Sequence, residues 1–286
     1  RIAPGTYLIV IAADDDTIRL SGLTLPPVKA ESIHSGSKRA EAQPEKGLIL
    51  GWNTSAAVIV RELENYVAEG SSMTIVAGED FEADVNAIGQ LENQELIFRA
   101  GDTTDRVLLD ELNIFDYDHV IVLADINLSM QDADARTLIT LLHLRDISEK
   151  DATPFSIVSE MLDLRNRELA EVAKVDDFIV SDHLISLMLA QLSENGYLFD
   201  VFTDLFDPEG SEIYLKPISD YIETGRPVNF YTVIEAARRR GETALGYRIV
   251  SELHDAAKSY GIHTNPKKSV EVAFSPEDKI IVLAES

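Results

Sequence analysis

The chain has 286 residues, with 25 Lys and Arg against 50 Asp and Glu, and its formal charge is -25. That charge argues against nucleic-acid binding, because neutralising phosphates requires clustered cations, and it should attract divalent cations instead. The sequence has no cysteine, which excludes disulfides, thiolate catalysis and cysteine zinc sites and is typical of a reducing compartment. No apolar run approaches the ~20 residues that a membrane span needs.

Two short segments near the ends of the sequence resemble each other. Residues 4–14 and 276–286 align without a gap, and four positions of this alignment are identical: Pro4 and Pro276, Ile9 and Ile281, Val10 and Val282, Ala12 and Ala284. Chance similarity between two β-strands would explain this. Alternatively, residues 1–16 hold the final strand of an upstream copy of the same domain. We adopt the second interpretation and, because the sequence begins with Arg1, take the chain as part of a longer protein.

Residues 17–46 show no sustained hydrophobic periodicity. They contain Pro26-Pro27 and then several Ser and Gly residues, with Lys38 and Arg39 nearby. Proline and small polar residues of this kind are typical of connecting segments without regular structure. We therefore predict a linker over residues 17–46.

A regular alternation of strands and helices begins at Gly47. Residues 48–50 are a short apolar run, typical of a strand that is buried on both faces. Gly51 then marks a tight turn, and Thr54 or Ser55 is placed to cap a helix. Strand, glycine turn and helix is how a doubly wound α/β domain opens, with the helix N-terminus facing any ligand.

The same alternation continues to residue 181. Further strands are predicted at residues 73–77, 95–99, 119–123, 155–159 and 177–180. Helices are predicted at residues 82–91, 105–112, 131–147 and 162–172. Strands that alternate with helices pair in parallel through right-handed crossovers. Residues 47–181 therefore predict the α/β class, with a Rossmann-like doubly wound parallel sheet.

The pattern changes at residue 182. Residues 182–193 and 197–206 predict two helices, separated by Asn195-Gly196, with apolar side chains on more than one side. This crossover helix pair, residues 182–207, is either a buried core element or a surface for a partner. We favour a partner surface at residues 182–206, because the pair follows the last strand of the sheet. Residues 208–286 predict a small α+β C-terminal lobe that ends in a strand at 279–284.

The glycine turn departs from the pattern of dinucleotide-binding turns. Such a turn needs three glycines so that the backbone can approach the pyrophosphate, whereas here only Gly51 is present and Trp52 would crowd that space. At the end of the second strand, Glu79 or Asp80 stands where a ribose-binding acid would lie. If a nucleotide binds, we expect it at Gly51, Trp52, Asn53, Asp80 and Gly101, but we favour a cation.

Acidic residues follow the third and fourth predicted strands. Because parallel strands end at one edge of a sheet, we expect Asp102, Asp125, Asp132 and Asp134 to converge there. Carboxylate oxygens are the ligands that calcium prefers, although the spacing matches no EF-hand loop. For Asp132 and Asp134 the alternative is that they only stabilise a helix N-terminus. The sequence thus predicts a calcium site at this edge, with these four aspartates as metal ligands.

No motif points to catalysis, and we assign no catalytic residue. The six His residues show no paired spacing typical of a metal site, and there is neither a nucleophile elbow nor a phosphate-binding loop. The run Asp14-Asp15-Asp16 is typical of a solvated charged stretch. We therefore predict that the chain is not an enzyme.

This order of elements resembles an RCK domain (regulator of potassium conductance), in which a nucleotide-binding-like lobe, a helix-turn-helix crossover and a small lobe follow one another. The resemblance to the CASTOR/POLLUX channel branch rests on Ile11–Asp16, Leu48–Trp52, Leu123–Asp125, Ala133–Leu138 and Leu144–Ile147. It implies the cytosolic gating-ring module of a cation channel. Two RCK units in each subunit would assemble into a ring with other RCK units, beneath a pore that this chain lacks.

Two functions from different classes therefore remain. The first is a regulatory module at the cytoplasmic face of a membrane channel, which senses calcium and transmits it to the pore. The second is a nicotinamide-dependent oxidoreductase, or a nucleotide-sensing RCK subunit, built on the same fold. The glycine turn after residue 50 discriminates between them and favours the first.

Overall fold

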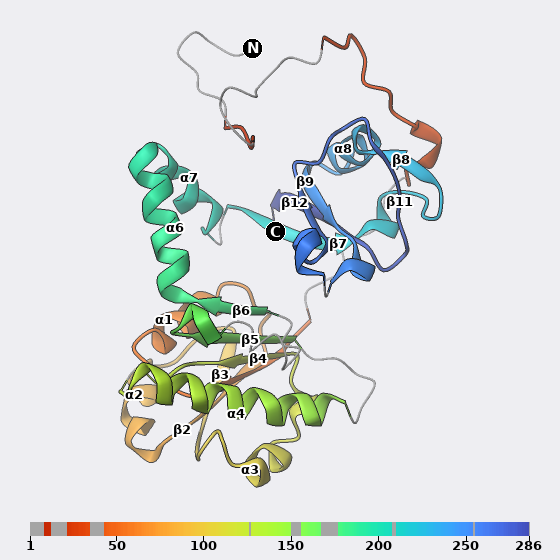
Figure 1. Cartoon of the computed structure of the whole chain (residues 1–286). Helices are drawn as coiled ribbons and strands as arrows, with labels where there is room; N and C mark the ends of the chain where they lie inside the picture. Colours follow the sequence, from red (N-terminus) through yellow and green to blue (C-terminus); the bar gives the residue numbers. More distant parts are fainter. Residues whose placement is uncertain are drawn as a thin grey trace. The chain divides into compact units, whose positions relative to one another are not determined.

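The computed structural model describes residues 9–12, 22–34, 43–125, 127–149, 156–166, 177–207, 210–253 and 255–285. The chain folds into two compact units. Figure 1 shows the whole chain, coloured from the N-terminus to the C-terminus. The first unit, Ala40–Phe199, lies between the two parts of the second in sequence. The second unit combines Arg1–Arg39 with Asp200–Ser286. We call them the N-terminal lobe and the C-terminal lobe.

The N-terminal lobe is built on a six-stranded sheet in which every pair of neighbours is parallel. Its strand order is β3-β2-β1-β4-β5-β6. The strands are β1 (Lys46–Leu50), β2 (Ser71–Ala77), β3 (Gln94–Ala100), β4 (His119–Val122), β5 (Ser156–Met161) and β6 (Asp177–Val180). The predicted doubly wound parallel sheet is confirmed.

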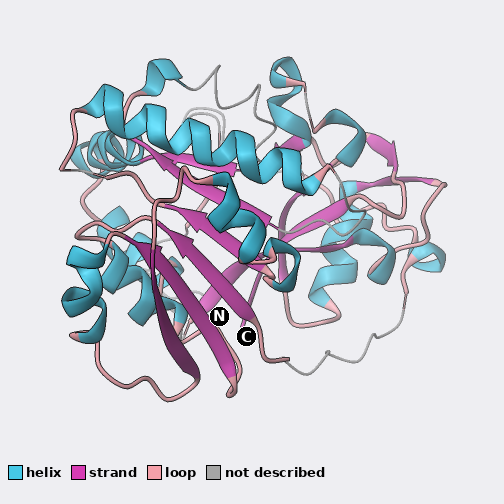
Figure 2. Cartoon of the chain, turned by 90° about the horizontal axis from the view of Figure 1, so that it is seen from below, coloured by secondary structure: helices cyan, strands magenta, loops and turns pink. Residues whose placement is uncertain are grey.

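Helices cover both faces of this sheet (Figure 2). They are α1 (Ala56–Leu63), α2 (Glu82–Asn86), α3 (Arg106–Glu111) and α4 (Met130–Ser148). Leu48 and Leu50 pack in the cluster with α3 and α4, whereas Ile49 packs in the cluster with α1 and α2. All three side chains are fully buried, which explains why β1 is an uninterrupted apolar run.

Several predicted boundaries differ from the structure. The helix expected at residues 82–91 ends at Asn86. Residues 164–166 form a 3-10 turn, and most of the helix expected at 162–172 lies outside the described residues. By contrast, α4 is one residue longer at each end than the expected helix. At its N-terminus the Ser129 hydroxyl oxygen accepts from the Asp132 backbone N–H, and this cap fixes where the helix begins.

Two further helices follow the last strand, α6 (Ser181–Glu194) and α7 (Leu198–Leu205). Many of their apolar side chains are exposed, so the helices are not ordinary core elements. These exposed side chains are Leu184, Ile185, Leu187, Leu189 and Phe199, flanked by Tyr197 and Phe206. Among the described residues, no helix is long and apolar enough to cross a membrane.

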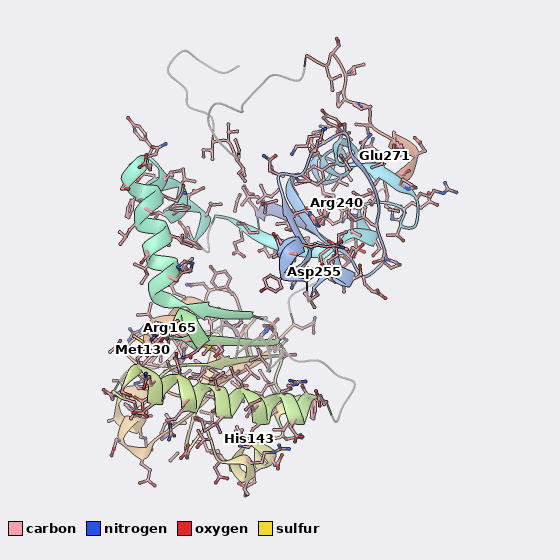
Figure 3. The ribbon with its side chains drawn as sticks, viewed as in Figure 1. Met130, His143, Arg165, Arg240, Asp255 and Glu271 are labelled. Atoms are coloured by element: carbon pink, nitrogen blue, oxygen red, sulfur yellow. The ribbon has the colours of Figure 1, made fainter. Side chains whose placement is uncertain are left out.

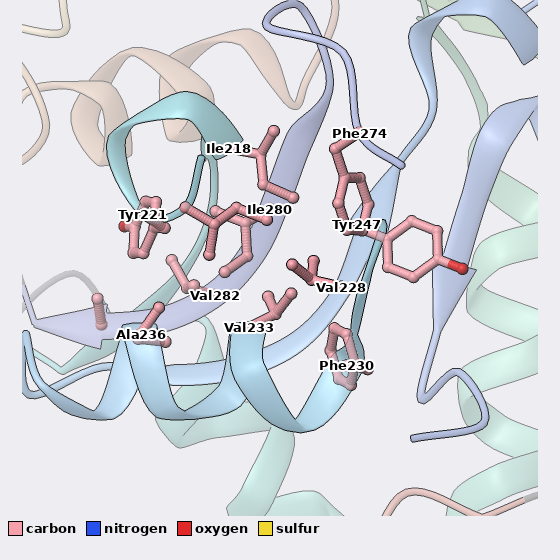
Figure 4. Packing of buried hydrophobic residues seen from close by; sticks show 13 residues of the cluster. Ile218, Tyr221, Val228, Phe230, Val233, Ala236, Tyr247, Phe274, Ile280 and Val282 are labelled. Carbon is pink, nitrogen blue, oxygen red and sulfur yellow. The ribbon is translucent and has the colours of Figure 1, made fainter. Parts of the chain in front are cut away.

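The C-terminal lobe is an antiparallel sheet of four strands in the order β10-β9-β12-β7, with a separate pair β11-β8. Its elements are β7 (Ser211–Pro217), β8 (Pro227–Asn229), α8 (Phe230–Arg238), β9 (Thr243–Arg248), β10 (Ile262–Thr264), β11 (Glu271–Ala273) and β12 (Lys279–Glu285). Figure 4 shows its core, where Val233 of α8 packs with Ile280 and Val282 of β12. The predicted closing strand is confirmed as β12.

The N-terminal segments differ from their expected forms. Residues 9–12 form no strand, and Ile9, Val10 and Ile11 are exposed, because no strand of the described sheets pairs with them. The rest of the strand expected at 4–14 lies outside the described residues. Within the predicted linker, residues 27–34 pack on the C-terminal lobe and include a 3-10 turn at Ala30–Ser32, whereas residues 22–26 are exposed.

Candidate functional site

A small cavity lies at the edge where the strands of the N-terminal lobe end. Its volume is about 60 Å³. Residues that follow β1, β2, β3 and β4 line it together with the first turns of α4, among them Gly51, Gly78, Gly101, Asp125 and Arg136. Pockets for drug-sized ligands measure roughly 300–1,000 Å³. This cavity therefore has room for an ion or a few waters, and a dinucleotide would not fit in it.

Gly51 is required by the backbone. Its φ of +99° lies in the left-handed region, and a Cβ placed there would stand 2.6 Å from the carbonyl oxygen of Leu123. A residue with a side chain would meet both penalties. The glycine thus allows the end of β4 to approach the turn after β1. Trp52 is 7% exposed and packs in the hydrophobic cluster around α1, so it serves the core as well as the cavity wall.

Asn53 closes the crevice between β1 and β4. Its amide nitrogen donates to the carbonyl oxygen of Ala124 at 2.9 Å and to Oε2 of Glu160 at 2.7 Å. The same Glu160 oxygen accepts from the Ala124 backbone N–H at 3.2 Å. In the strand order β3-β2-β1-β4-β5-β6, this is the switch point where doubly wound sheets bind dinucleotides. Here side chains of the chain itself occupy that crevice.

The same asparagine also bonds the backbone just before α1. Ser55 occupies the N-cap position of α1 but makes no capping bond with its side chain. Asn53 Oδ1 instead accepts from the Ser55 backbone N–H at 2.9 Å. The expected N-cap position is therefore correct for Ser55, but its side chain makes no capping bond, and the Asn53 side chain instead forms a turn just before the helix.

Of the two remaining positions predicted to bind a nucleotide, one lines the cavity and the other does not. Gly101 lines the cavity, and a Cβ there would stand 2.4 Å from a methyl carbon of Leu108. Asp80 lies in the exposed 3-10 turn after β2 and is not among the cavity-lining residues. Of the five predicted positions, Gly51, Trp52 and Gly101 line the cavity, whereas Asn53 is bonded to the protein itself. The nucleotide assignment has not gained support from this geometry.

Asp102 is held by neighbours on both sides. It accepts from the Thr104 backbone N–H at 2.9 Å and hydroxyl at 2.7 Å, and from the Arg136 guanidinium at 2.6 Å. Partial burial raises the pKa of Asp102, but the Thr104 hydrogen bonds and the Arg136 charge outweigh it, so this pKa lies below its ordinary value. The carboxylate is therefore already neutralised by a cation of the chain.

Asp125 and Asp132 make local bonds. Asp125 lines the cavity, and its Oδ1 accepts from the Asn127 backbone N–H at 3.0 Å. Asp132 accepts from the Ser129 hydroxyl at 2.6 Å in the first turn of α4. Asp132 thus has the helix-end role that was the alternative to metal binding. Asp125 keeps one carboxylate oxygen for which no bond is described.

Asp134 is buried and is hydrogen-bonded to the loop that follows β5. It is 1% exposed and accepts from the backbone N–H groups of Leu162 and Asp163, at 2.8 and 3.0 Å, and from the Asn166 amide at 2.7 Å. Three donors satisfy a buried carboxylate without a metal. Asp134 therefore joins α4 to the loop that follows β5.

The four aspartates do not form one cluster. In the described ranges there is no group of three or more His, Asp or Glu that could hold a metal ion. Each carboxylate has a different partner, and Asp102, which was expected to converge with Asp125, is paired with Arg136. Calcium binding at this edge stays a prediction, and a cation would have to exchange with that ion pair.

Sequence reasoning missed two residues of this edge, Arg136 and Glu160. Arg136 lies four residues after Asp132 on α4, and helical spacing from Ser129 would have directed attention to it. Glu160 sits within β5, where an acid among apolar residues was the available signal.

No family model matches the chain. It is 30% identical to the probable ion channel CASTOR of Oryza sativa subsp. japonica and 29% identical to the ion channel DMI1 of Medicago truncatula, in each case over 98% of this chain and 35% of the relative. It is 29% identical to the probable ion channel POLLUX of Arabidopsis thaliana, over 99% of this chain and 38% of that protein. The chain thus spans about a third of the length of these relatives, and the predicted resemblance to the CASTOR/POLLUX branch is confirmed.

The fold is also found in a solved gating ring. The human SLO3 gating ring matches with a TM-score of 0.55 and 11% sequence identity, over 85% of this chain and 44% of that one. At this identity the match shows a shared fold. It agrees with the Rossmann-like sheet, helical crossover and small lobe that the RCK resemblance implies.

Proposed function

We propose that this chain, a homologue of the CASTOR and POLLUX ion channels over nearly its whole length, is a cytosolic regulatory module of a cation channel. The observation that carries the proposal is the similarity over 98% of the chain to proteins named as ion channels. The fold shared with the SLO3 gating ring supports the same role. In this account the module belongs to a gating ring, and the pore lies in the part of the protein that this chain does not span.

We place the regulatory ligand at the cavity at the carboxyl edge of the N-terminal lobe. The volume of about 60 Å³ suits a small ion, and the closed crevice at Asn53 disfavours a dinucleotide. Calcium is the first candidate, because hard cations prefer oxygen ligands and the chain carries a charge of -25. Asp125 faces this cavity, and Asp102 would become available when Arg136 releases it.

We place the contacts with other RCK units on α6 and α7. Leu187 and Leu189 of α6 are 51% and 61% exposed, and Phe199 of α7 is 62% exposed. Burial of apolar area stabilises association by roughly 25 cal/mol per Å² before the costs of assembly are subtracted. Exposed apolar helices of this kind fit an obligate ring better than a free monomer.

Calorimetric titration of calcium tests the ligand. We expect saturable heat with the unmodified chain, and Asp125→Asn should weaken binding about tenfold or more because it removes a charged ligand. Asp84→Asn is the matched control, since Asp84 is an exposed aspartate on α2 that does not line the cavity. Absence of heat at millimolar calcium would leave these aspartates with structural roles only.

A further inference from the structure

We call residues 22–34 the strap, and its last residues, 32–34, pair with the C-terminal lobe through the backbone. Ile33 forms an antiparallel bridge with Ile222. The His34 backbone N–H donates to the Tyr221 carbonyl at 2.9 Å, and the Glu223 N–H donates to the Ser32 carbonyl at 2.8 Å. The Ile33 side chain packs against the core of the lobe, and Ser32 is 5% exposed. This end of the strap is therefore built into the lobe as an extra strand-like segment.

The other end of the strap is held at the N-terminus of α8. The Asn229 amide donates to the Pro27 carbonyl at 2.7 Å, and the Lys29 backbone N–H donates to the Thr232 hydroxyl at 3.0 Å. Asn229 Oδ1 also accepts from the Thr232 backbone N–H at 3.1 Å, which caps α8. One buried asparagine thus caps the helix and binds the strap, so the two structures depend on each other.

Lys29 joins the strap to both strands of the small β-pair. Its Nζ donates to the Pro227 carbonyl of β8 at 2.9 Å and to Glu271 Oε1 of β11 at 2.6 Å. The Lys29 side chain is 35% exposed, so this pair is partly shielded from water. Figure 1 shows the short turn of the strap beside β8 and β11, and Figure 3 labels Glu271 there.

From these contacts we infer that the C-terminal lobe has a docking surface for an extended segment, and that the strap is its resident occupant. The docking surface runs from the backbone edge at Tyr221 and Ile222, past Asn229, to Glu271. The strap and this surface are separated in sequence by the whole N-terminal lobe, yet they belong to one compact unit. A displacement that arrives from the chain before residue 22 is therefore delivered to α8 and β8 of the C-terminal lobe before it reaches β1.

This arrangement has a regulatory consequence, which rests on the proposed gating-ring function. The docked strap makes the C-terminal lobe and the preceding chain move together, while the N-terminal lobe is an insertion between them in sequence. Loosening the strap would weaken the transfer of a ligand-induced movement without removing any residue of the ligand cavity. The docking itself is a property of the folded chain and is measured without any channel.

Retention after cleavage tests the docking. The chain has no cysteine, so Thr24→Cys provides a unique site for a fluorescent label on an exposed part of the strap. A protease recognition site replaces residues 37–40, the folded protein is cut there, and fluorescence anisotropy follows release of the labelled fragment. We expect the fragment to stay bound after the cut. Lys29→Met and Glu271→Gln should each release it about tenfold faster, equivalent to about 1.4 kcal/mol.

Glu31→Gln is the matched control, because Glu31 is an exposed charge within the strap for which no contact is described. It should leave the release rate unchanged. Loss of the fragment as soon as the chain is cut would overturn the inference, as would equal release rates for Lys29→Met, Glu271→Gln and Glu31→Gln. Because no calcium and no pore are involved, either result is distinct from a failure of the gating-ring proposal.

Discussion

The carboxyl edge of the N-terminal lobe and the helices α6 and α7 differ in how their side chains are accommodated. Polar groups at the edge are hydrogen-bonded within the lobe, whereas apolar side chains on the helices are exposed. At the edge, Asn53, Asp102 and Asp134 all have hydrogen-bond partners within the lobe. On α6, Leu184 and Leu187 expose about half of their surface. A ligand that takes Asp102 at the edge must replace its bond to Arg136, which keeps the net gain in free energy small and the binding reversible. A partner on α6 breaks no such bond, which suits a lasting contact.

The largest effect should come from removing the buried carboxylate of Asp134, which joins α4 to the loop after β5. Asp134→Leu leaves two backbone N–H groups and the Asn166 amide without their acceptor. With about 1–3 kcal/mol for each unsatisfied buried donor, partly relieved by water, we expect a loss of about 3 kcal/mol in the free energy of unfolding. Urea unfolding measures it. The exposed control Asp84→Asn should change this quantity by less than about 0.5 kcal/mol.

Charges placed on the exposed surface of α6 should lower the mass of the assembly and leave the fold of the chain unchanged. Leu187→Glu with Leu192→Glu puts two charges on α6, which would lie in the contact with another copy. We expect light scattering to report a smaller assembly, while circular dichroism stays unchanged. Gln191→Glu, an exposed position on the same helix, is the control for added charge. An unchanged mass in the double variant would show that α6 does not join copies.

A smaller effect should follow from the ion pair at the edge. Because the pKa of Asp102 is lowered in the folded chain, its contribution to stability is present above the unfolded pKa and is lost as pH falls through the folded value. The pair is about half exposed, so the contribution should stay below about 1 kcal/mol. Arg136→Gln should therefore flatten the loss of stability between about pH 5 and pH 2, measured by urea unfolding. Arg61→Gln, on the exposed side of α1, should leave the slope as it is.

The last prediction is the absence of an effect: we expect the chain not to oxidise a reduced nicotinamide cofactor. The Asn53 and Glu160 side chains occupy the crevice in which a dinucleotide would lie, and the turn holds one glycine where three are needed. Oxidation of a reduced nicotinamide cofactor, followed by its absorbance across a panel of small carbonyl compounds, should not exceed the rate without protein. A rate that depends on protein concentration would favour the oxidoreductase alternative.

Much of the fold follows from local patterns, whereas the contacts at the edge depend on distant residues. The Leu48–Leu50 run predicts a buried strand because both faces of that strand are covered. No local pattern pairs Asn53 with Glu160, which lies 107 positions away, or Asp134 with the loop after β5. The strap escaped prediction for the same reason. It has no helical or strand period, and its bonds reach residues about 200 positions further along the chain.

The central claim is that an ion at the carboxyl edge regulates a channel, and currents through a channel that contains this chain test it most directly. Excised patches would expose the cytosolic face to calcium-free solution and then to millimolar calcium. We expect calcium to change the open probability about 5- to 150-fold, which is the range that typical coupling free energies produce, and we expect this change to be lost in Asp125→Asn but not in Asp84→Asn. An open probability that is the same with and without calcium, or a full response in Asp125→Asn, would contradict it.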